Sequence, residues 1–178
     1  MDALQQLAAV FPEPAKDIRM NLASVLQQTS LTPQQKFGVA IAVAHAVRPP
    51  ALVAAIAAAA GEALTPAVAA DAQAAAALMA MNNVYYRFRH MVGKPGYEQL
   101  PPRLRMQRLA APASDKVDFE LFALAVSAVN GCGTCVQAHE RVVTEGGLSL
   151  AQVNDAVRIA ATVNAAATTL AMTAAMSA

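Results

Sequence analysis

The chain has 178 residues, enough for one domain with a substantial hydrophobic core but short for two. Its 13 basic and 12 acidic residues nearly cancel, which excludes the strongly positive surface that a nucleic-acid partner requires. Hydrophobic residues make up 56% of the chain and aromatic residues only 4%, and alanine, the best helix former, supplies the excess. We therefore expect a single all-α domain, residues 1–178, whose helices pack closely on small side chains.

Proline and threonine signals mark the first predicted helices. Pro14 suits the first turn of a helix that runs to about Gln28. Thr32-Pro33-Gln34-Gln35 supplies a capping threonine, a proline at the first helical position and a glutamine at the third, so a second helix begins here and ends before Pro49. The later signals predict helices over residues 51–60, 66 to about 87, 115 to about 130, 132 to about 146 and from 150 onward, with Ser114 and Ser149 as caps and residues 93–102 irregular.

The chain is weakly similar to itself after a shift of 84 residues. Leu64-Thr65 then lies on Leu148-Ser149, and Asp71-Ala72 lies on Asp155-Ala156. Both segments contain a helix, a break, a second helix, a glycine and a long capped helix. We therefore predict an internal repeat, about residues 31–92 and 115–176, in which only the second copy carries the chemistry.

No segment of the sequence favours secretion or a membrane. The N-terminus lacks the basic start and apolar run of a signal peptide. Apolar stretches at residues 37–47, 51–60 and 67–81 are each shorter than the roughly 18 residues of a membrane span, or contain polar residues. We expect a cytoplasmic protein without a membrane partner.

A Cys-x-x-Cys pair, Cys132 and Cys135, is the strongest indication of chemistry. Two cysteines this close indicate a redox or metal pair rather than a secreted disulfide scaffold. A thiol reacts as its thiolate, and the start of a helix favours that negative charge. His139 lies one turn after Cys135 on the same helical face, where it can accept or hold a proton. Gly131 and Gly133 allow a substrate or other backbone to approach closely.

Glu120 is a candidate partner of His139, because it interrupts the apolar helix at residues 117–124. A partly buried carboxylate needs a hydrogen-bond or charge partner, and a Cys–His–Glu chain would orient and charge the imidazole. A surface position, or a salt bridge to Arg141, explains the same residue equally well.

Other residues favour structural interpretations. Zinc would need two further ligands, and His139 lies too close to the cysteines to form a usual second pair, so we expect no metal. His45 is expected to be a satisfied core histidine and His90 to be exposed. We expect Tyr85 and Tyr86 to pack an interface. The basic stretches are expected to be solvated faces or salt bridges between subunits: Arg87, Arg89, His90 and Lys94, then Arg103, Arg105 and Arg108.

Glu120, Cys132, Cys135 and His139 together resemble the signature of the AhpD-like branch of the carboxymuconolactone decarboxylase superfamily, which includes bacterial alkyl hydroperoxide reductases. The stretch Asn82-Asn83-Val84-Tyr85-Tyr86 strengthens the resemblance, which covers essentially the whole chain. It implies an all-helical AhpD-like fold of two similar helical halves, with the Cys-x-x-Cys pair at a helix N-terminus, assembled as a homotrimer.

The resemblance also implies roles for these residues. Cys135 would attack the peroxide and become a sulfenic acid. Cys132, the more accessible thiol, would resolve it as a Cys132–Cys135 disulfide and form the mixed disulfide with a peroxiredoxin. Glu120 and His139 would relay protons. Thr134 stands where some relatives have a second relay histidine, and a hydroxyl cannot accept a full proton near neutral pH.

The implied partners supply electrons, since no nucleotide-binding motif predicts a bound flavin or nicotinamide and no bound cofactor is expected. Dihydrolipoamide on a lipoyl-bearing 2-oxoacid dehydrogenase acyltransferase would reduce the disulfide, and dihydrolipoamide dehydrogenase would recharge the lipoyl group. The substrates would be organic hydroperoxides and the oxidised peroxiredoxin AhpC.

Three other functions remain open. A decarboxylase of the muconolactone type would not need the Cys-x-x-Cys pair. A redox switch or interaction protein of the same fold would form the disulfide without peroxidase turnover. A structural zinc module ranks third.

Overall fold

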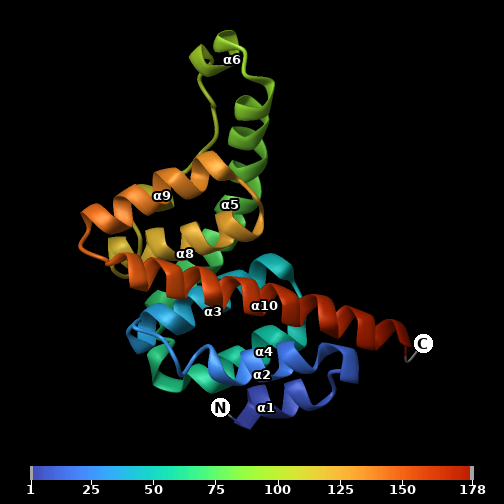
Figure 1. Cartoon of the computed structure of the whole chain (residues 1–178). Helices are drawn as coiled ribbons and strands as arrows, with labels where there is room; N and C mark the ends of the chain where they lie inside the picture. The colour runs from blue at the N-terminus through green and yellow to red at the C-terminus, as the bar shows by residue number, and fades with distance from the viewer. Residues whose placement is uncertain (1, 177–178) are drawn as a thin grey trace.

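The computed structural model describes residues 2–176, and within this range helices are the only regular secondary structure, which confirms the all-α prediction (Figure 1). The helices are α1 (Asp2–Ala9), α2 (Lys16–Ser24), α3 (Pro33–Val47), α4 (Pro50–Ala60), α5 (Pro66–Val92), α6 (Pro95–Gln99), α7 (Gln107–Ala110), α8 (Lys116–Val129), α9 (Gly133–Glu145) and α10 (Leu150–Met176), with 3₁₀ turns at Glu13–Ala15 and Gly61–Ala63. No helix in the described range is long and apolar enough to cross a membrane.

Helix caps follow the sequence signals closely. The Thr32 hydroxyl accepts a hydrogen bond from the Gln35 backbone N–H, and the Gln35 side chain accepts one from the Thr32 N–H, which completes the expected capping box. Thr65 caps α5 through the Val68 N–H. Ser149 and Gln152 exchange the same pair of bonds at the start of α10.

Three local predictions are wrong. The N-terminal segment forms a 3₁₀ turn and a shorter α2 instead of one helix to Gln28, and it is preceded by α1, which carried no cap signal. The stretch expected to be irregular contains the short helix α6. The cap of α8 is Asp115, whose carboxylate accepts bonds from two N–H groups of the first turn, whereas Ser114 bonds elsewhere.

The core is built around α3 and α8. Every residue of α3 from Phe37 to Ala44 is buried, and so is every residue of α8 from Asp118 to Ser127. These two helices pack on each other, and α5 and α10 pack on both. At their crossing a Cβ on Gly38 would lie 2.1 Å from the Phe122 ring, so only glycine permits this approach. The site-bearing helix α8 is therefore fixed from several sides.

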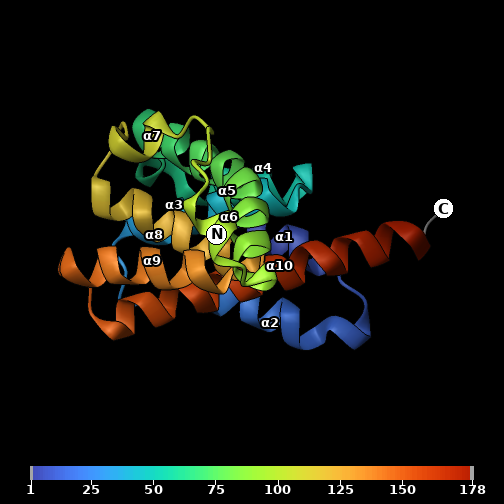
Figure 2. The ribbon, with the colours of Figure 1, turned by 90° about the horizontal axis from the view of Figure 1, so that it is seen from above.

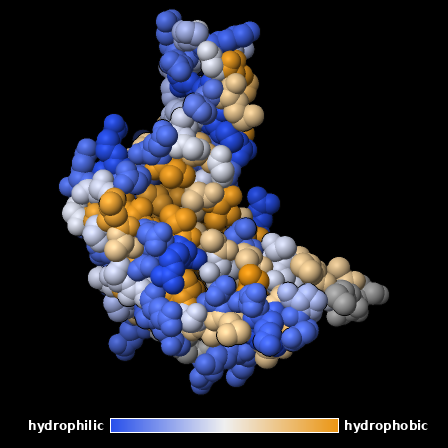
Figure 3. Space-filling view, in the orientation of Figure 1, coloured by the Kyte–Doolittle hydropathy of each residue, from blue (hydrophilic) through white to orange (hydrophobic). Residues whose placement is uncertain are grey.

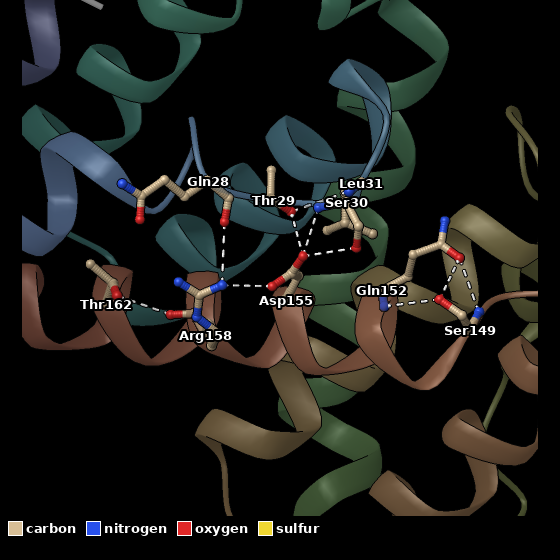
Figure 4. Close-up of polar contacts among 9 residues, drawn as sticks. All are labelled: Gln28, Thr29, Ser30, Leu31, Ser149, Gln152, Asp155, Arg158 and Thr162. Atoms are coloured by element: carbon tan, nitrogen blue, oxygen red, sulfur yellow. Dashed lines mark hydrogen bonds and ion pairs between the residues drawn. The ribbon is translucent and has the colours of Figure 1, made fainter.

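Two aspartates tie the two halves of the chain together by reciprocal bonds. Asp71 of α5 accepts hydrogen bonds from the Ser114 N–H at 2.6 Å and the Ser114 hydroxyl at 2.7 Å. Asp155 of α10 accepts bonds from the Ser30 N–H at 2.6 Å and the Ser30 hydroxyl at 2.8 Å (Figure 4). Each aspartate thus holds the segment before the first helix of the other half. Ser30 and Ser114 are themselves 84 residues apart, the predicted shift, and this favours the internal repeat, which stays a prediction.

An arm projects from the helical body. The second half of α5 continues beyond the other helices and carries α6 at its end (Figure 1), and the view from above looks down onto this arm (Figure 2). We call residues 84–105 the arm, and none of them is buried. Within the described part of the chain, the arm therefore lacks a core of its own.

Candidate functional site

The turn between α8 and α9 places the cysteines. Gly131 has a φ of +68°, the left-handed region that glycine adopts without strain. The Gly131 N–H donates to the Ala128 carbonyl and the Cys132 N–H to the Ser127 carbonyl, which is the Schellman arrangement that ends a helix. Cys132 is at the same time the N-cap of α9. The sequence Asn-Gly-Cys thus ends one helix and begins the next within three residues.

Cys132 and Cys135 form a disulfide across the first turn of α9, with Cα atoms 5.3 Å apart. Cys132 is 0% exposed, whereas Cys135 is 7% exposed and contributes to the wall of a cavity. The expectation that Cys132 is the more accessible of the two is therefore wrong for the chain in this form. The reason is the Schellman turn, which places Cys132 against the end of α8.

Glu120 and His139 contact each other directly. The Glu120 Oε2 lies 2.5 Å from the His139 Nδ1, and the Glu120 Oε1 lies 2.5 Å from the Lys116 Nζ. The Glu120 side chain is 8% exposed, because α8 packs against α9 along this edge. This decides between the two interpretations of Glu120: it is a buried partner of His139, not a surface residue or a partner of Arg141.

The charge of Glu120 follows from these contacts. Burial by itself raises the pKa of Glu120, but the hydrogen bonds and charges of His139 and Lys116 outweigh it and hold that pKa below its ordinary value. As a carboxylate it accepts only, so the His139 Nδ1 carries the proton that is donated to it. The other ring nitrogen, Nε2, is then the one that can accept a proton from a reacting group.

Two residues of α5 brace the cysteine turn. The Asn83 Nδ2 donates to the buried Ser127 hydroxyl at 2.9 Å, and the Asn83 Oδ1 accepts from the Asn130 Nδ2 at 2.9 Å. The Arg87 guanidinium donates to the Asn130 carbonyl. The sequence did not predict that Asn83 and Arg87 hold the cysteine turn, and Arg87 was expected to be solvated or to bridge subunits. The two adjacent asparagines inside an apolar helix were the sequence feature that could have indicated buried hydrogen bonds here.

A cavity of about 320 Å³ lies beside Cys135 and His139. Helix α9 contributes the polar and reactive part of the wall, and helix α5 with the segment around α7 contributes most of the rest. The lining residues are Met79, Asn82, Tyr86, Met106, Leu109, Thr134, Cys135, Ala138 and His139. The cavity thus combines a sulfur and an imidazole with a largely apolar wall, as small-molecule sites do. Tyr86, expected only to pack an interface, lines this cavity.

Asn82, Thr134 and the Tyr86 hydroxyl are the remaining polar groups of the cavity. The Thr134 hydroxyl lies 3.6 Å from the Cys132 sulfur. Asn82 is 4% exposed, and its Oδ1 has no hydrogen-bond partner among residues 2–176. An unpaired buried carbonyl oxygen costs about 1–3 kcal/mol.

The other candidate residues do not line the cavity beside Cys135. His45 is half-buried in a separate cavity of about 560 Å³ and has no hydrogen bond in the described range, so the expectation of a satisfied core histidine is wrong. Burial lowers the pKa of His45. His90 is exposed, as expected. Arg108 is not free in solvent, because its guanidinium lies 2.8 Å from the buried Asp71 carboxylate.

The fold and the site together define a helical protein with a disulfide-forming Cys-x-x-Cys pair backed by a glutamate–histidine pair. The Carboxymuconolactone decarboxylase family model matches residues 95–178. The alkyl hydroperoxide reductase AhpD of Anaeromyxobacter dehalogenans strain 2CP-C is 63% identical over 170 residues, 96% of this chain and 91% of that protein. The AhpD of Bradyrhizobium sp. strain BTAi1 is 50% identical over 93% of this chain and 91% of its own length. That of Rhodospirillum centenum is 49% identical over 98% and 94%.

Identity of this extent over nearly the whole of both chains shows the family. The chain belongs to the AhpD-like branch of the carboxymuconolactone decarboxylase superfamily.

Proposed function

We propose that the chain is an antioxidant dithiol peroxidase and disulfide reductase, which reduces alkyl hydroperoxides and the oxidised peroxiredoxin AhpC. The observation that supports this most is the single cavity that brings together Cys135 and His139, with Glu120 bonded to the far side of the imidazole. The names of the relatives, alkyl hydroperoxide reductases, support the same activity.

The peroxide step begins from the reduced pair. The Cys135 thiolate attacks the terminal oxygen of the hydroperoxide, the O–O bond breaks, and the alkoxide takes a proton to leave as an alcohol. Cys135 is then a sulfenic acid. The Cys132 thiolate attacks this sulfur, the hydroxyl leaves as water after protonation, and the disulfide forms. We propose that His139, whose Nδ1 is bonded to Glu120, passes the protons at its Nε2.

Electrons return from a dithiol. Two thiols of a dihydrolipoyl group reduce the disulfide, so one hydroperoxide and one dihydrolipoyl group give an alcohol, water and an oxidised lipoyl group. We propose the lipoyl-bearing acyltransferase of a 2-oxoacid dehydrogenase as the carrier and dihydrolipoamide dehydrogenase as its reductase. No bound cofactor enters this cycle.

The mixed disulfide with the peroxiredoxin is proposed at Cys132. Because Cys132 is fully covered in the disulfide form, this step requires that reduction or partner binding uncovers the turn at residues 130–133. Thr134 has no imidazole to relay a proton. Reduction of the peroxiredoxin needs no proton relay at position 134. We therefore expect Thr134 to affect this reaction less than the reduction of hydroperoxides.

We further propose a homotrimer. Three apolar side chains of the arm, Val84, Phe88 and Met91, are 60%, 46% and 76% exposed and recur at helical spacing on α5. Hydrophobic residues also gather on the surface below the arm, in the region of α8 and α9 (Figure 3). An exposed apolar face of this kind marks an interaction surface, and a second copy of the chain would cover it.

A coupled assay tests the function. Purified protein, lipoamide, dihydrolipoamide dehydrogenase and cumene hydroperoxide are combined, and NADH loss is followed with and without the peroxiredoxin. We expect peroxide-dependent turnover that disappears in Cys132→Ser. Turnover only with the peroxiredoxin present would reduce the role to electron transfer. No turnover in either format would favour the redox switch.

A further inference from the structure

Asn82 lies in the wall of the cavity beside Cys135, and the reaction described above gives it no role. Its side chain is nine-tenths buried, and no hydrogen bond from residues 2–176 reaches its carboxamide. A leucine or methionine would fill the same position without leaving a buried oxygen unpaired. A polar group here, without a partner in its own chain, indicates a partner that arrives from outside.

The neighbouring Asn83 makes the contrast clear. Both its nitrogen and its oxygen are bonded within the chain, since it donates to Ser127 and accepts from Asn130. Both asparagines are buried, with exposures of 4% for Asn82 and 1% for Asn83. They differ in their contacts, because Asn83 bonds to the cysteine turn whereas Asn82 lines the cavity. Asn83 is therefore structural, and the same explanation does not extend to Asn82.

The cavity wall restricts the chemistry of the partner. Apart from the site residues and the Tyr86 hydroxyl, the lining is apolar, with Met79 from α5 and Leu109 from α7. A carboxamide that no bond fixes can turn either its oxygen or its nitrogen toward a ligand. The ligand should therefore have an apolar body and a head that both donates and accepts hydrogen bonds. The –O–O–H group has this pattern, whereas a thiol is only a weak donor.

We propose that the Asn82 carboxamide binds the –O–O–H group of an alkyl hydroperoxide and holds its terminal oxygen against the Cys135 sulfur, while the apolar wall holds the alkyl group. This inference rests on the peroxidase function proposed above. Asn82 takes no proton and forms no covalent bond. Its Oδ1 accepts the hydrogen bond of the terminal O–H, which orients the O–O bond for attack.

Two half-reactions of Asn82→Leu test the proposal. The reduced protein is mixed with cumene hydroperoxide, and the loss of the two cysteine thiols is followed, since the chain has no tryptophan to report on the reaction. The disulfide form is separately reduced with dihydrolipoamide. We expect the rate constant with the hydroperoxide to fall about tenfold or more, the size of one good hydrogen bond, and the rate constant with dihydrolipoamide to stay within about twofold.

Thermal unfolding provides the control for a structural role. Asn82→Leu should unfold at the same or a higher temperature, because it removes an unpaired buried group, whereas Asn83→Leu should unfold lower because it leaves Ser127 and Asn130 unpaired. Asn82→Met repeats the test with a more adaptable side chain, in case leucine does not fit.

The outcomes separate the two proposals. If the wild-type protein oxidises with cumene hydroperoxide and both Asn82 variants do so equally fast, the role of Asn82 is refuted and the peroxidase function stands. A parallel slowing of both half-reactions, or a lower unfolding temperature, would also overturn it, in favour of a packing role. If the wild-type thiols do not react with the hydroperoxide, the peroxidase function fails first.

Discussion

At the scale of single residues, the site depends on which atoms the turn at residues 130–133 exposes. Cys135 reaches the cavity, whereas Cys132 is covered by the end of α8. The Glu120 carboxylate fixes the His139 tautomer and is itself held by Lys116. Substitutions of Cys132, Cys135 and Glu120 are therefore expected to change different steps of the reaction.

Trapping of the peroxiredoxin distinguishes the two cysteines. Cys135→Ser leaves Cys132 free, and we expect it to accumulate a mixed disulfide with the oxidised peroxiredoxin, because no second thiol is present to release it. Cys132→Ser should accumulate much less. Non-reducing electrophoresis with mass spectrometry measures both adducts. The opposite preference would move the exchange step to Cys135, the sulfur that lines the cavity.

Glu120→Gln tests the proton relay and its pH dependence. A folded-state pKa below the ordinary value means that the carboxylate adds stability at neutral pH, and that this stability is lost as the pH falls through that lowered pKa. We expect Glu120→Gln to cost about 1–3 kcal/mol at pH 7 and progressively less in acid, and to slow peroxide turnover about 10- to 100-fold.

Chemical denaturation at several pH values and steady-state kinetics measure these effects. Lys116→Met is the matched control, because it removes the more exposed partner of Glu120 and should cost about 1 kcal/mol or less. A constant stability difference down to low pH in Glu120→Gln would contradict the account.

At the scale of secondary-structure elements, the reciprocal aspartates place the two halves of the chain. Burial raises the pKa of Asp71, but bonds from Ala113, Ser114 and Arg108 outweigh it and leave that pKa lowered. Burial also raises the pKa of Asp155, but the hydrogen bonds from Ser30 outweigh burial and leave that pKa lowered. Both carboxylates thus act as charged acceptors at neutral pH, and both lose their contribution as pH falls through their lowered pKa values.

The two aspartates should differ in the size of their effect. The Asp71 side chain is 0% exposed and the Asp155 side chain 11% exposed, and the partner of Asp155, Arg158, is also the more exposed of the two arginines. We expect Asp71→Asn to lower the free energy of unfolding by about 2–4 kcal/mol and Asp155→Asn by about 1–2 kcal/mol. Urea unfolding measures both. Equal effects, or a larger effect at Asp155, would show that burial of the carboxylate does not set the cost.

Element-scale features were the most predictable from sequence, because caps and breaks are local. The capping boxes at Thr32 and Ser149 and the breaks at Pro49 and Gly146 gave helix positions close to those observed. The cap of α8 was misassigned, since Ser114 bonds to an aspartate 43 residues away. Such long-range bonds have no signature in the local sequence.

The site was predictable in its reactive residues but not in its surroundings. Cys132, Cys135, His139 and Glu120 carry spacing and burial signals along α8 and α9. The cavity wall comes from α5 and the α7 segment, which are far away in the sequence, so nothing local indicated that Asn82 and Tyr86 reach the cysteines. The burial of Cys132 depends on tertiary packing and was likewise not predictable.

At the scale of the whole molecule, the projecting arm is the feature that a single chain does not explain. Its exposed apolar residues include Val84, Phe88 and Met91, and none of residues 84–105 is buried. Helices of this kind are usually stabilised by packing against another surface. The homotrimer proposed above would supply that surface.

Charge on the exposed face of α5 tests the assembly. We expect Met91→Asp, and more strongly the double variant Val84→Asp with Met91→Asp, to dissociate the oligomer, because a carboxylate in an apolar interface loses its hydration without gaining a partner. Sedimentation velocity measures the mass. Asp2→Ala, in α1 at the opposite end of the molecule from the arm (Figure 1), serves as the unaffected control. A wild-type protein that is already monomeric would refute the trimer.

The central claim is that Cys132 and Cys135 together reduce one hydroperoxide. The most direct measurement adds one equivalent of cumene hydroperoxide to the reduced protein and determines the products by mass spectrometry and chromatography. The account predicts one cumyl alcohol and one intramolecular 132–135 disulfide per chain, and a stable sulfenic acid at Cys135 in Cys132→Ser. Free thiols that survive the peroxide, or a disulfide that forms without alcohol, would contradict it.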